Sequence, residues 1–251
     1  MELELSGKTV LVTGSSRGIG RAIAEVLCAE GCRVAVNGRN AGMLNACASE
    51  IGAEVALVGD VSDAVEAQRI VNDAVIALGG LDILVCNVGS GRSVSPGEET
   101  YDEWQRVFAL NLWSTTNTVE AARESLAVAR GVIVCVSSIC GLEVVPSAPV
   151  TYSAAKAALH AYVRGIARTL GKKGVRINAV APGNILFDGS VWSRKLSEDA
   201  SAVKNMLQSD VALARLGTPR DVAELTAYLA SPRASFATGG VWTLDGGQVH
   251  S

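Results

Sequence analysis

The feature that most limits the fold of this chain is a glycine-rich turn between an apolar segment and an amphipathic one. Residues 8–12, Lys-Thr-Val-Leu-Val, form a short run rich in β-branched residues, which predicts a buried strand. Residues 14–20 then have the spacing Gly-x-x-x-Gly-x-Gly, and apolar residues follow at helical spacing from Ile23 to Leu27. A strand, a tight turn and a helix in this order predict the first unit of an α/β fold.

The glycines of this turn suit the binding of a phosphate group. Without side chains they let the backbone turn tightly and approach an anion, and the N-terminus of the following helix supplies free N–H groups and partial positive charge. A purely structural turn is the alternative. Its position directly after a strand favours a dinucleotide-binding site.

A second strand is expected at residues 33–37, and its tip bears on which nicotinamide cofactor is used. In a dinucleotide fold, an acid at this tip bonds the ribose 2′-hydroxyl, whereas an arginine accommodates a 2′-phosphate. The tip carries Arg39 and no carboxylate, and we expect Arg17 from the first turn to reach the same place. Each charge-assisted hydrogen bond contributes roughly 1.5–3 kcal/mol, so two arginines favour NADP. The alternative for Arg39 is a solvated turn residue.

The pattern of strand and helix repeats along the chain. Repeated β-α units of this length predict a doubly wound (Rossmann) parallel sheet in a three-layer α/β/α arrangement, forming a single domain over residues 1–251. The strand tips gather on one edge, where ligands bind. The segment 186–216 is irregular, with a partly helical pattern at Trp192, Met206 and Leu207, and is expected to be a substrate lid. Further strands are expected at 54–58, 81–86, 131–136, 175–180 and 240–244, and helices up to 78 and at 101–129, 152–171 and 219–230.

Composition excludes several classes of protein. The net charge of −3 has no basic excess, so no nucleic-acid partner is expected, and no apolar run approaches the ~20 residues of a membrane span. The acidic start lacks the regions of a signal peptide, and the six cysteines lack disulfide or metal spacing, which predicts free thiols in a cytoplasmic protein. With only His160 and His250, no histidine-rich metal site or Ser-His-Asp triad is expected.

Tyr152 and Lys156 are four residues apart in an alanine-rich segment, which places them on one face of a helix. Such a pair is more often an ordinary surface pair. A fixed ammonium beside a phenol is nevertheless a means of lowering the phenol's pKa. Moving that pKa from about 10 to about 7 needs roughly 4 kcal/mol. One ammonium at about 4 Å supplies that order of energy at an effective dielectric constant near 20.

Taken together, the motifs resemble those of the short-chain dehydrogenase/reductase family, specifically its compact single-domain members such as 3-oxoacyl-carrier-protein reductases. Residues 13–20, 87–89 and 245–247 resemble three motifs of the family. The resemblance implies a NADP(H)-dependent oxidoreductase that transfers hydride between a nicotinamide and a carbonyl or secondary alcohol. The implied catalytic tetrad is Asn111, Ser138, Tyr152 and Lys156. The implied cofactor-binding residues are Gly14, Ser16, Arg17, Gly18, Ile19, Gly20, Arg39, Asp60, Val61, Asn87, Gly89, Tyr152, Lys156, Pro182, Gly183 and Ile185.

The resemblance also implies roles for the tetrad. Tyr152 gives the proton in the reduction direction, and Ser138 bonds the carbonyl oxygen, with Ser137 as the alternative. Lys156 lowers the phenol pKa and holds the nicotinamide ribose, and Asn111 holds a water that links Lys156 to solvent. Family members are mostly tetramers, so a homotetramer or a dimer is expected.

Three departures from the family pattern concern the substrate side. Cys86 replaces an asparagine, Phe187 replaces a threonine, and the interval between Ser138 and Tyr152 is one residue longer than is common. Arg92 would meet an acid or a phosphate, or else be a solvated loop residue. An apolar pocket is expected from Val144, Val145, Pro146, Phe187, Val191 and Trp192.

The direction of the reaction and the substrate stay open: an acyl thioester, a cyclic ketone, a sugar and a steroid-like molecule are all compatible. The alternative function is that of a NADP-binding sensor or scaffold protein without turnover.

Overall fold

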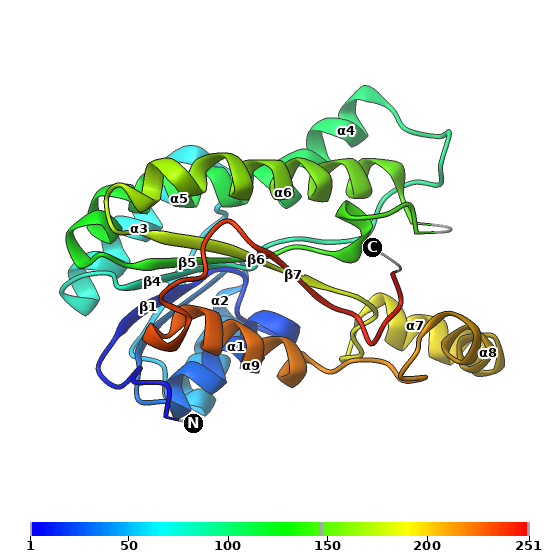
Figure 1. Cartoon of the computed structure of the whole chain (residues 1–251), viewed down its shortest axis with the longest axis horizontal. Helices are drawn as coiled ribbons and strands as arrows, with labels where there is room; N and C mark the ends of the chain where they lie inside the picture. Colours follow the sequence, from blue (N-terminus) through cyan, green and yellow to red (C-terminus); the bar gives the residue numbers. More distant parts are fainter. Residues whose placement is uncertain (1, 146–147, 250–251) are drawn as a thin grey trace.

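The chain forms one parallel sheet between two layers of helices. A computed structural model describes residues 2–145 and 148–249, and in them seven strands pair in the order β3-β2-β1-β4-β5-β6-β7. Every pairing is parallel. Helices α3, α5 and α6 lie on one face of the sheet and α1, α2 and α9 on the other (Figure 1). The predicted doubly wound three-layer α/β/α fold is therefore confirmed.

The strands are short, as is usual for a buried parallel sheet. They are β1 (Thr9–Val12), β2 (Arg33–Gly38), β3 (Val55–Val58), β4 (Ile83–Cys86), β5 (Val132–Val136), β6 (Arg176–Pro182) and β7 (Val241–Leu244). The α-helices are α1 (Gly18–Ala29), α2 (Ala41–Ile51), α3 (Ala64–Leu78), α4 (Tyr101–Phe108), α5 (Ser114–Ala129), α6 (Val150–Gly171), α7 (Val191–Glu198), α8 (Ala200–Asp210) and α9 (Pro219–Ala230). Three shorter helical segments are η1 (Ala109–Trp113), η2 (Ile139–Gly141) and η3 (Pro232–Ala234).

Alternate residues of the central strands face the two helical layers, so the chain has two hydrophobic cores. Val10 and Val12 of β1 pack with α1, α2 and α9. Leu11, between them, packs with α3, α5 and α6 on the other face. Because side chains alternate along a strand while both faces are covered, the strands read as continuous apolar runs.

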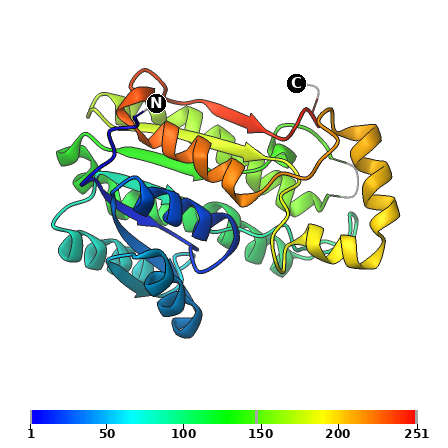
Figure 2. The ribbon, with the colours of Figure 1, turned by 90° about the horizontal axis from the view of Figure 1, so that it is seen from below.

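Two segments differ from the expectation. The helix expected over 101–129 is interrupted by η1, a π-helical turn that contains Asn111. A π-turn adds one residue to a helical turn and often marks a functional position. The lid segment, expected to be irregular and partly helical, contains two complete helices, α7 and α8, which lie beyond the carboxyl ends of the strands (Figure 2). Ser190 and Asp199 begin these helices, and each accepts a hydrogen bond from a backbone N–H of the first turn.

Candidate active site

The glycine-rich turn has the geometry of an anion cradle. Gly14 and Gly18 have φ of +62° and +58°, which glycine adopts without strain. Helix α1 begins without a side-chain cap and without an acid in its first turn, so its first N–H groups are left for another acceptor. Asn87 at the tip of β4 supports the turn, since its Nδ2 donates to the carbonyl oxygens of Thr13 at 3.1 Å and Gly14 at 2.9 Å. The cradle fits the pyrophosphate of a dinucleotide.

Arg39 and Asp60 form an ion pair at the tips of β2 and β3, with 3.2 Å between Nη1 and Oδ2. Burial opposes ionisation of Asp60, but hydrogen bonds from Ser62 and Arg39 hold the carboxyl pKa below its usual value. An exposed pair of this kind contributes little stability, so the Arg39 guanidinium is available to a phosphate at little cost. Ser16 lies beside the same tip, next to Gly38.

Arg17 is placed elsewhere than expected. Its Nη1 lies against Gly189 of the lid, 3.3 Å from where a Cβ of that glycine would stand, whereas Arg39 pairs with Asp60. The expectation that both arginines reach one place is therefore not met in this conformation. Arg17 itself has extended backbone geometry at the start of α1.

Phe187 covers the start of α1. A Cβ built on Gly18 would lie 2.6 Å from Cε2 of the Phe187 ring, so the ring rests directly on the glycine. Ile19, the next residue, is partly buried and packs with the same core as Phe187. The residue that departs from the family pattern thus covers the cradle from the lid side.

Pro182, Gly183 and Ile185 continue from the end of β6 along the same edge. The Gly183 N–H donates to the Leu244 carbonyl oxygen at 3.0 Å, and a Cβ on Gly183 would lie 2.7 Å from that of Asp245. Ile185 is buried and pairs with Gly217 in a parallel bridge. The Val61 side chain is buried in the core under α3, and the Val61 carbonyl oxygen accepts from Asn117 Nδ2 of α5 at 3.5 Å.

Asn111 and Lys156 converge on Gly89. Asn111 is fully buried; its Oδ1 accepts from the Ser90 N–H at 2.9 Å, and its Nδ2 donates to the Ser90 and Val107 carbonyl oxygens. A Cβ on Gly89 would lie 2.9 Å from Asn111 Oδ1 and 3.2 Å from Lys156 Nζ. The π-turn therefore brings the Asn111 amide and the Lys156 ammonium to one point.

Ser138 and Tyr152 form the other half of the tetrad. Ser138 lies two residues after β5 and caps η2, where its Oγ accepts from the Cys140 N–H at 3.2 Å. Burial raises the pKa of Tyr152 to about 12, a hydrogen bond with Ser138 lowers it, and Cys140 raises it further. Burial also lowers the pKa of Lys156 to about 8.

The predicted effect of Lys156 on the phenol is not found in this state of the chain. Lys156 Nζ lies 5.8 Å from the centroid of the Tyr152 ring and donates to the Val136 carbonyl oxygen at 3.1 Å. The ammonium thus stands over the ring and not at the hydroxyl, and desolvation of the phenol outweighs its influence.

The structure separates the two serines at the tip of β5. The Ser137 Oγ lies 2.6 Å from His160 Nε2, whereas Ser138 is the serine that lowers the pKa of Tyr152. Ser138 is therefore the serine that faces the phenol. Sequence reasoning missed His160 as part of this region, although its spacing of four from Lys156 repeats that between Lys156 and Tyr152.

Polar contacts join the loop after β4 to α4, to α6 and to the lid. The Ser93 hydroxyl donates to Glu103 Oε1 at 2.6 Å, so the Thr151 hydroxyl, 2.7 Å away, must donate to Ser93. Arg92 Nη2 donates to the Gly189 carbonyl oxygen at 3.4 Å. Arg92 is therefore a solvent-exposed loop residue that also contacts the lid.

The expected apolar lining is only partly assembled. The Val144 side chain is 95% exposed, Val145, Val191 and Trp192 are half-buried, and Pro146 lies outside the described residues. Lys195 Nζ stands 4.6 Å from the Trp192 ring centroid.

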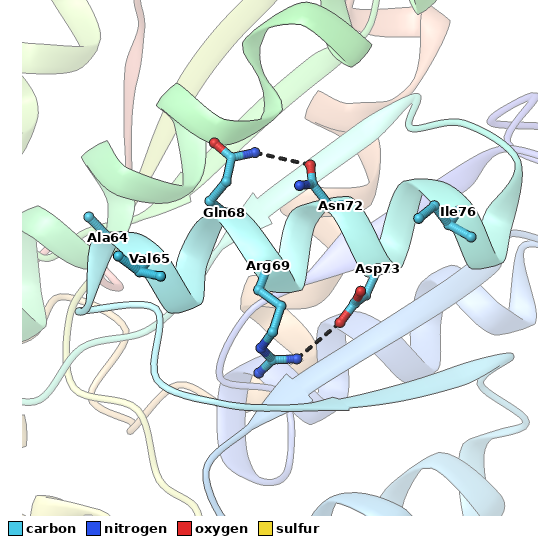
Figure 3. A pocket seen from close by; sticks show the side chains of 7 residues that line it. All are labelled: Ala64, Val65, Gln68, Arg69, Asn72, Asp73 and Ile76. Carbon is cyan, nitrogen blue, oxygen red and sulfur yellow. Dashed lines mark hydrogen bonds and ion pairs between the residues drawn. The ribbon is translucent and has the colours of Figure 1, made fainter.

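Two surface hollows in the described part of the chain lie away from this site. One is lined by Thr9, Arg33 and Asp82, among others, at the amino ends of the strands. The other lies on the outer face of α3, where Arg69 pairs with Asp73 (Figure 3). Its lining residues are Ala64, Val65, Gln68, Arg69, Asn72, Asp73 and Ile76. Neither hollow contains a candidate catalytic residue.

Three further findings concern the described residues. No helix among them has both the length and the apolar character needed to cross a membrane. All six cysteines are free thiols; Cys47, Cys86 and Cys135 are buried and the other three are half-buried. No three His, Cys, Asp or Glu side chains of these residues gather into a group that could hold a metal ion.

Known proteins resemble this chain over nearly its whole length. A family model described as enoyl-(acyl carrier protein) reductase matches residues 14–249. The 3-oxoacyl-[acyl-carrier-protein] reductase of Aquifex aeolicus is 35% identical over 98% of this chain and 99% of its own. The cyclic-di-GMP-binding biofilm dispersal mediator protein of Escherichia coli is 35% identical over 96% and 97%.

A solved structure is similar to this chain in its fold as well. The L-sorbose reductase of Gluconobacter frateurii, complexed with NADPH and L-sorbose, superposes with a TM-score of 0.93 at 27% identity, covering all of both chains. Both the sequence and the arrangement of elements are therefore shared with oxidoreductases that use nicotinamide cofactors.

Proposed function

This chain belongs to the short-chain dehydrogenase/reductase family, and we propose that it is a NADP(H)-dependent ketoreductase. The family makes it an oxidoreductase with a nicotinamide cofactor. The observation that carries the proposal is the convergence of the tetrad: Ser138 lies beside Tyr152 and lowers the pKa of its phenol, and Asn111 and Lys156 meet at Gly89. A protein that only binds a dinucleotide has no need of this arrangement.

The bound cofactor supplies the hydride. Tyr152 is the proton donor to the carbonyl oxygen, and its raised pKa keeps the phenol protonated at neutral pH. Ser138, on the same side as the phenol, bonds the carbonyl oxygen and orients it. Lys156, with a pKa of about 8, is positively charged at neutral pH and stabilises the phenolate left behind. Asn111 holds the loop at Ser90, and beside Lys156 it holds the water that links the ammonium to solvent.

The preference for NADP(H) rests on Arg39. Its ion pair with Asp60 is exposed, so the guanidinium can turn to a 2′-phosphate, and no carboxylate of β2 stands at that tip to repel one. The cofactor-binding set we propose is the cradle of Gly14, Ser16, Gly18, Ile19 and Gly20, with Arg17, Arg39, Asp60, Val61, Asn87, Gly89, Tyr152, Lys156, Pro182, Gly183 and Ile185.

Mixing the protein with NADPH and a panel of ketones tests the function, with loss of NADPH absorbance as the readout. The panel contains a 3-oxoacyl thioester, a cyclic ketone, a keto sugar and an oxo-steroid, because the relatives act on different classes. Oxidation of NADPH with at least one ketone is the expected result. Binding of NADPH without oxidation by any ketone would favour the second candidate, a sensor or scaffold. That candidate is supported by the Escherichia coli relative, which is named for binding a cyclic dinucleotide.

We also propose that the chain assembles as a homotetramer, or as a dimer, in the cytoplasm. Ala157, Ala161 and Gly165 form an exposed small-residue face of α6 that permits close helix packing between subunits. Light scattering on the purified protein measures the assembly, and a monomer would exclude it. The free thiols suit a reducing compartment.

A further inference from the structure

His160 continues the line of inward-facing residues on α6, one turn beyond Lys156. The imidazole is 2% exposed, and each of its nitrogens has its own partner. Nε2 lies 2.6 Å from Ser137 Oγ, and Nδ1 lies 3.1 Å from the Gly141 carbonyl oxygen. Ser137 comes directly before Ser138, and Gly141 ends the short helix η2 that Ser138 begins. One side chain therefore holds both ends of the turn that carries Ser138.

The hydrogen-bond partners determine the tautomer of His160. A carbonyl oxygen only accepts, so Nδ1 carries the hydrogen that bonds Gly141. In the neutral ring Nε2 is then an acceptor, and the Ser137 hydroxyl donates to it. Burial lowers the pKa of His160 to about 4, the bond to Gly141 opposes this, and the positive charges of Arg164 and Lys156 add to it. The ring is therefore neutral at neutral pH, and both bonds keep a fixed direction.

The turn is pressed against α6 where His160 holds it. The Gly141 N–H donates to the Ser138 carbonyl oxygen at 3.1 Å. A Cβ on Gly141 would lie 2.6 Å from the Lys156 carbonyl carbon and 2.7 Å from His160 Cε1. The turn thus packs on the backbone between these two residues, and a change at His160 is passed directly to Ser138.

We propose that His160 is a positioning residue for the reaction: through Ser137 and Gly141 it sets the place of the Ser138 hydroxyl relative to Tyr152. The proposal rests on the proposed function, because the position of Ser138 matters for turnover only if Ser138 orients a carbonyl. His160 itself does not touch the reacting atoms.

Three variants separate the two bonds. His160→Gln places an amide oxygen near the position of Nε2 and keeps an acceptor for Ser137. His160→Asn places an amide nitrogen near Nδ1 and keeps a donor for Gly141. His160→Leu removes both bonds, and we expect it to lower kcat roughly tenfold or more, because small misplacements of a catalytic group are costly. We expect the KM for NADPH to stay within about twofold, since the phosphate cradle is built from other elements. The Gln and Asn variants should fall between parent and Leu.

A double-mutant cycle tests the bond between Ser137 and His160. Ser137→Ala and His160→Asn remove the same interaction, so the double variant should lose little more kcat than either single variant. Additive losses would mean that the two side chains act independently, which contradicts the proposal.

Val163→Ala is the matched control for a purely structural effect. Val163 is fully buried on α6, so its truncation lowers Tm without touching the Ser138 turn, and kcat should be kept. If the His160 variants lower Tm as Val163→Ala does and also keep kcat, His160 is only structural and the proposal is overturned. If His160→Leu does not fold, the Gln and Asn variants supply the same comparison.

Crystal structures of parent and variant make the test independent of turnover. If the parent reduces no ketone, the proposed function fails by itself. A shift of Ser138 Oγ by more than about 0.5 Å relative to Tyr152 in a His160 variant would support the positioning role, and an unmoved Ser138 would overturn it.

Discussion

The ammonium of Lys156 stands over the face of the Tyr152 ring, 5.8 Å from its centroid, and donates a hydrogen bond to the carbonyl oxygen of Val136. Both side chains are desolvated, and the ammonium is not placed to stabilise a charge on the hydroxyl. Burial therefore favours the neutral form of each group: it lowers the pKa of Lys156 to about 8 and raises the pKa of Tyr152 to about 12. The chain by itself holds a protonated phenol, the form that a reductase needs.

Replacing Tyr152 with Phe should abolish most turnover and leave cofactor binding almost unchanged. The ring that packs over Lys156 is kept, and only the proton donor is lost. Loss of a proton donor lowers kcat roughly 10²–10⁴-fold, which corresponds to about 3–5 kcal/mol. Steady-state rates and a fluorescence titration with NADPH measure the two effects. A variant as active as the parent would exclude Tyr152 as the acid.

The rate of ketone reduction should fall as the pH rises through about 8. Burial lowers the pKa of Lys156 to about 8, so its charge is present below that pH and is lost above it. Without the charge, the phenolate formed by proton transfer is no longer stabilised. The measurement is kcat between pH 6 and pH 10, taken as a roughly four-unit window around the Lys156 pKa. In the Lys156→Arg variant the guanidinium stays charged throughout this range. Its kcat should be lower than that of the parent but should not fall as the pH rises. The same fall in the variant would assign the pH dependence to another group.

Arg39→Asp should weaken NADPH binding far more than NADH binding. The change removes a charge-assisted hydrogen bond to the 2′-phosphate, roughly 1.5–3 kcal/mol or about 10–150-fold in affinity, and adds repulsion. Michaelis constants for both cofactors measure the preference. Arg220, also exposed and also paired with a carboxylate, that of Glu224, provides the control variant Arg220→Asp. Equal Michaelis constants for the two cofactors in the parent would refute the NADP assignment.

Phe187→Ala should increase the rate at which NADPH binds. The Phe187 ring rests on Gly18 at the start of α1, where the pyrophosphate must approach the N–H groups, so the ring has to move before the cofactor is seated. Stopped-flow fluorescence measures the association rate. Leu186→Ala is the neighbouring control, since Leu186 is exposed. An unchanged or slower association in Phe187→Ala would show that the ring does not obstruct the cradle.

His160 should make the fold less stable as the pH falls from about 6.5 to about 4. Its pKa is lowered from 6.5 to about 4 in the folded chain, so the unfolded chain binds more protons in this window and unfolding is favoured by acid. Chemical denaturation at several pH values gives the unfolding free energy. His160→Gln should flatten this part of the pH dependence, whereas His250 is common to both proteins. The same slope in parent and variant would contradict a neutral, buried His160.

Much of the site could be predicted because its parts follow strand tips. In a parallel sheet the carboxyl ends of all strands meet at one edge, so the turn after β1, Asn87 after β4 and Ser138 after β5 converge once the strands are located. The spacing of four between Tyr152 and Lys156 likewise determines that they share a helix face. The lid was harder to predict, because α7 and α8 bury almost no side chains: none of α7 and only Val203 of α8 is buried.

Side-chain directions could not be predicted, because they depend on distant contacts. Arg17 lies along Gly189, and the ring of Phe187 lies on Gly18, although nothing in their local sequence indicates either contact. The partners of His160 come from the end of β5 and from η2, more than 18 residues earlier in the chain.

By itself, the sequence determined the fold class and the residues available for chemistry, because the period of apolar residues and the glycine spacing act locally. Only the tertiary structure decided that Ser138 and not Ser137 faces the phenol, and that Lys156 stands over the Tyr152 ring. The physical reason is that these choices depend on desolvation and on hydrogen bonds between elements far apart in the chain. Neither exists until the sheet has closed against α6.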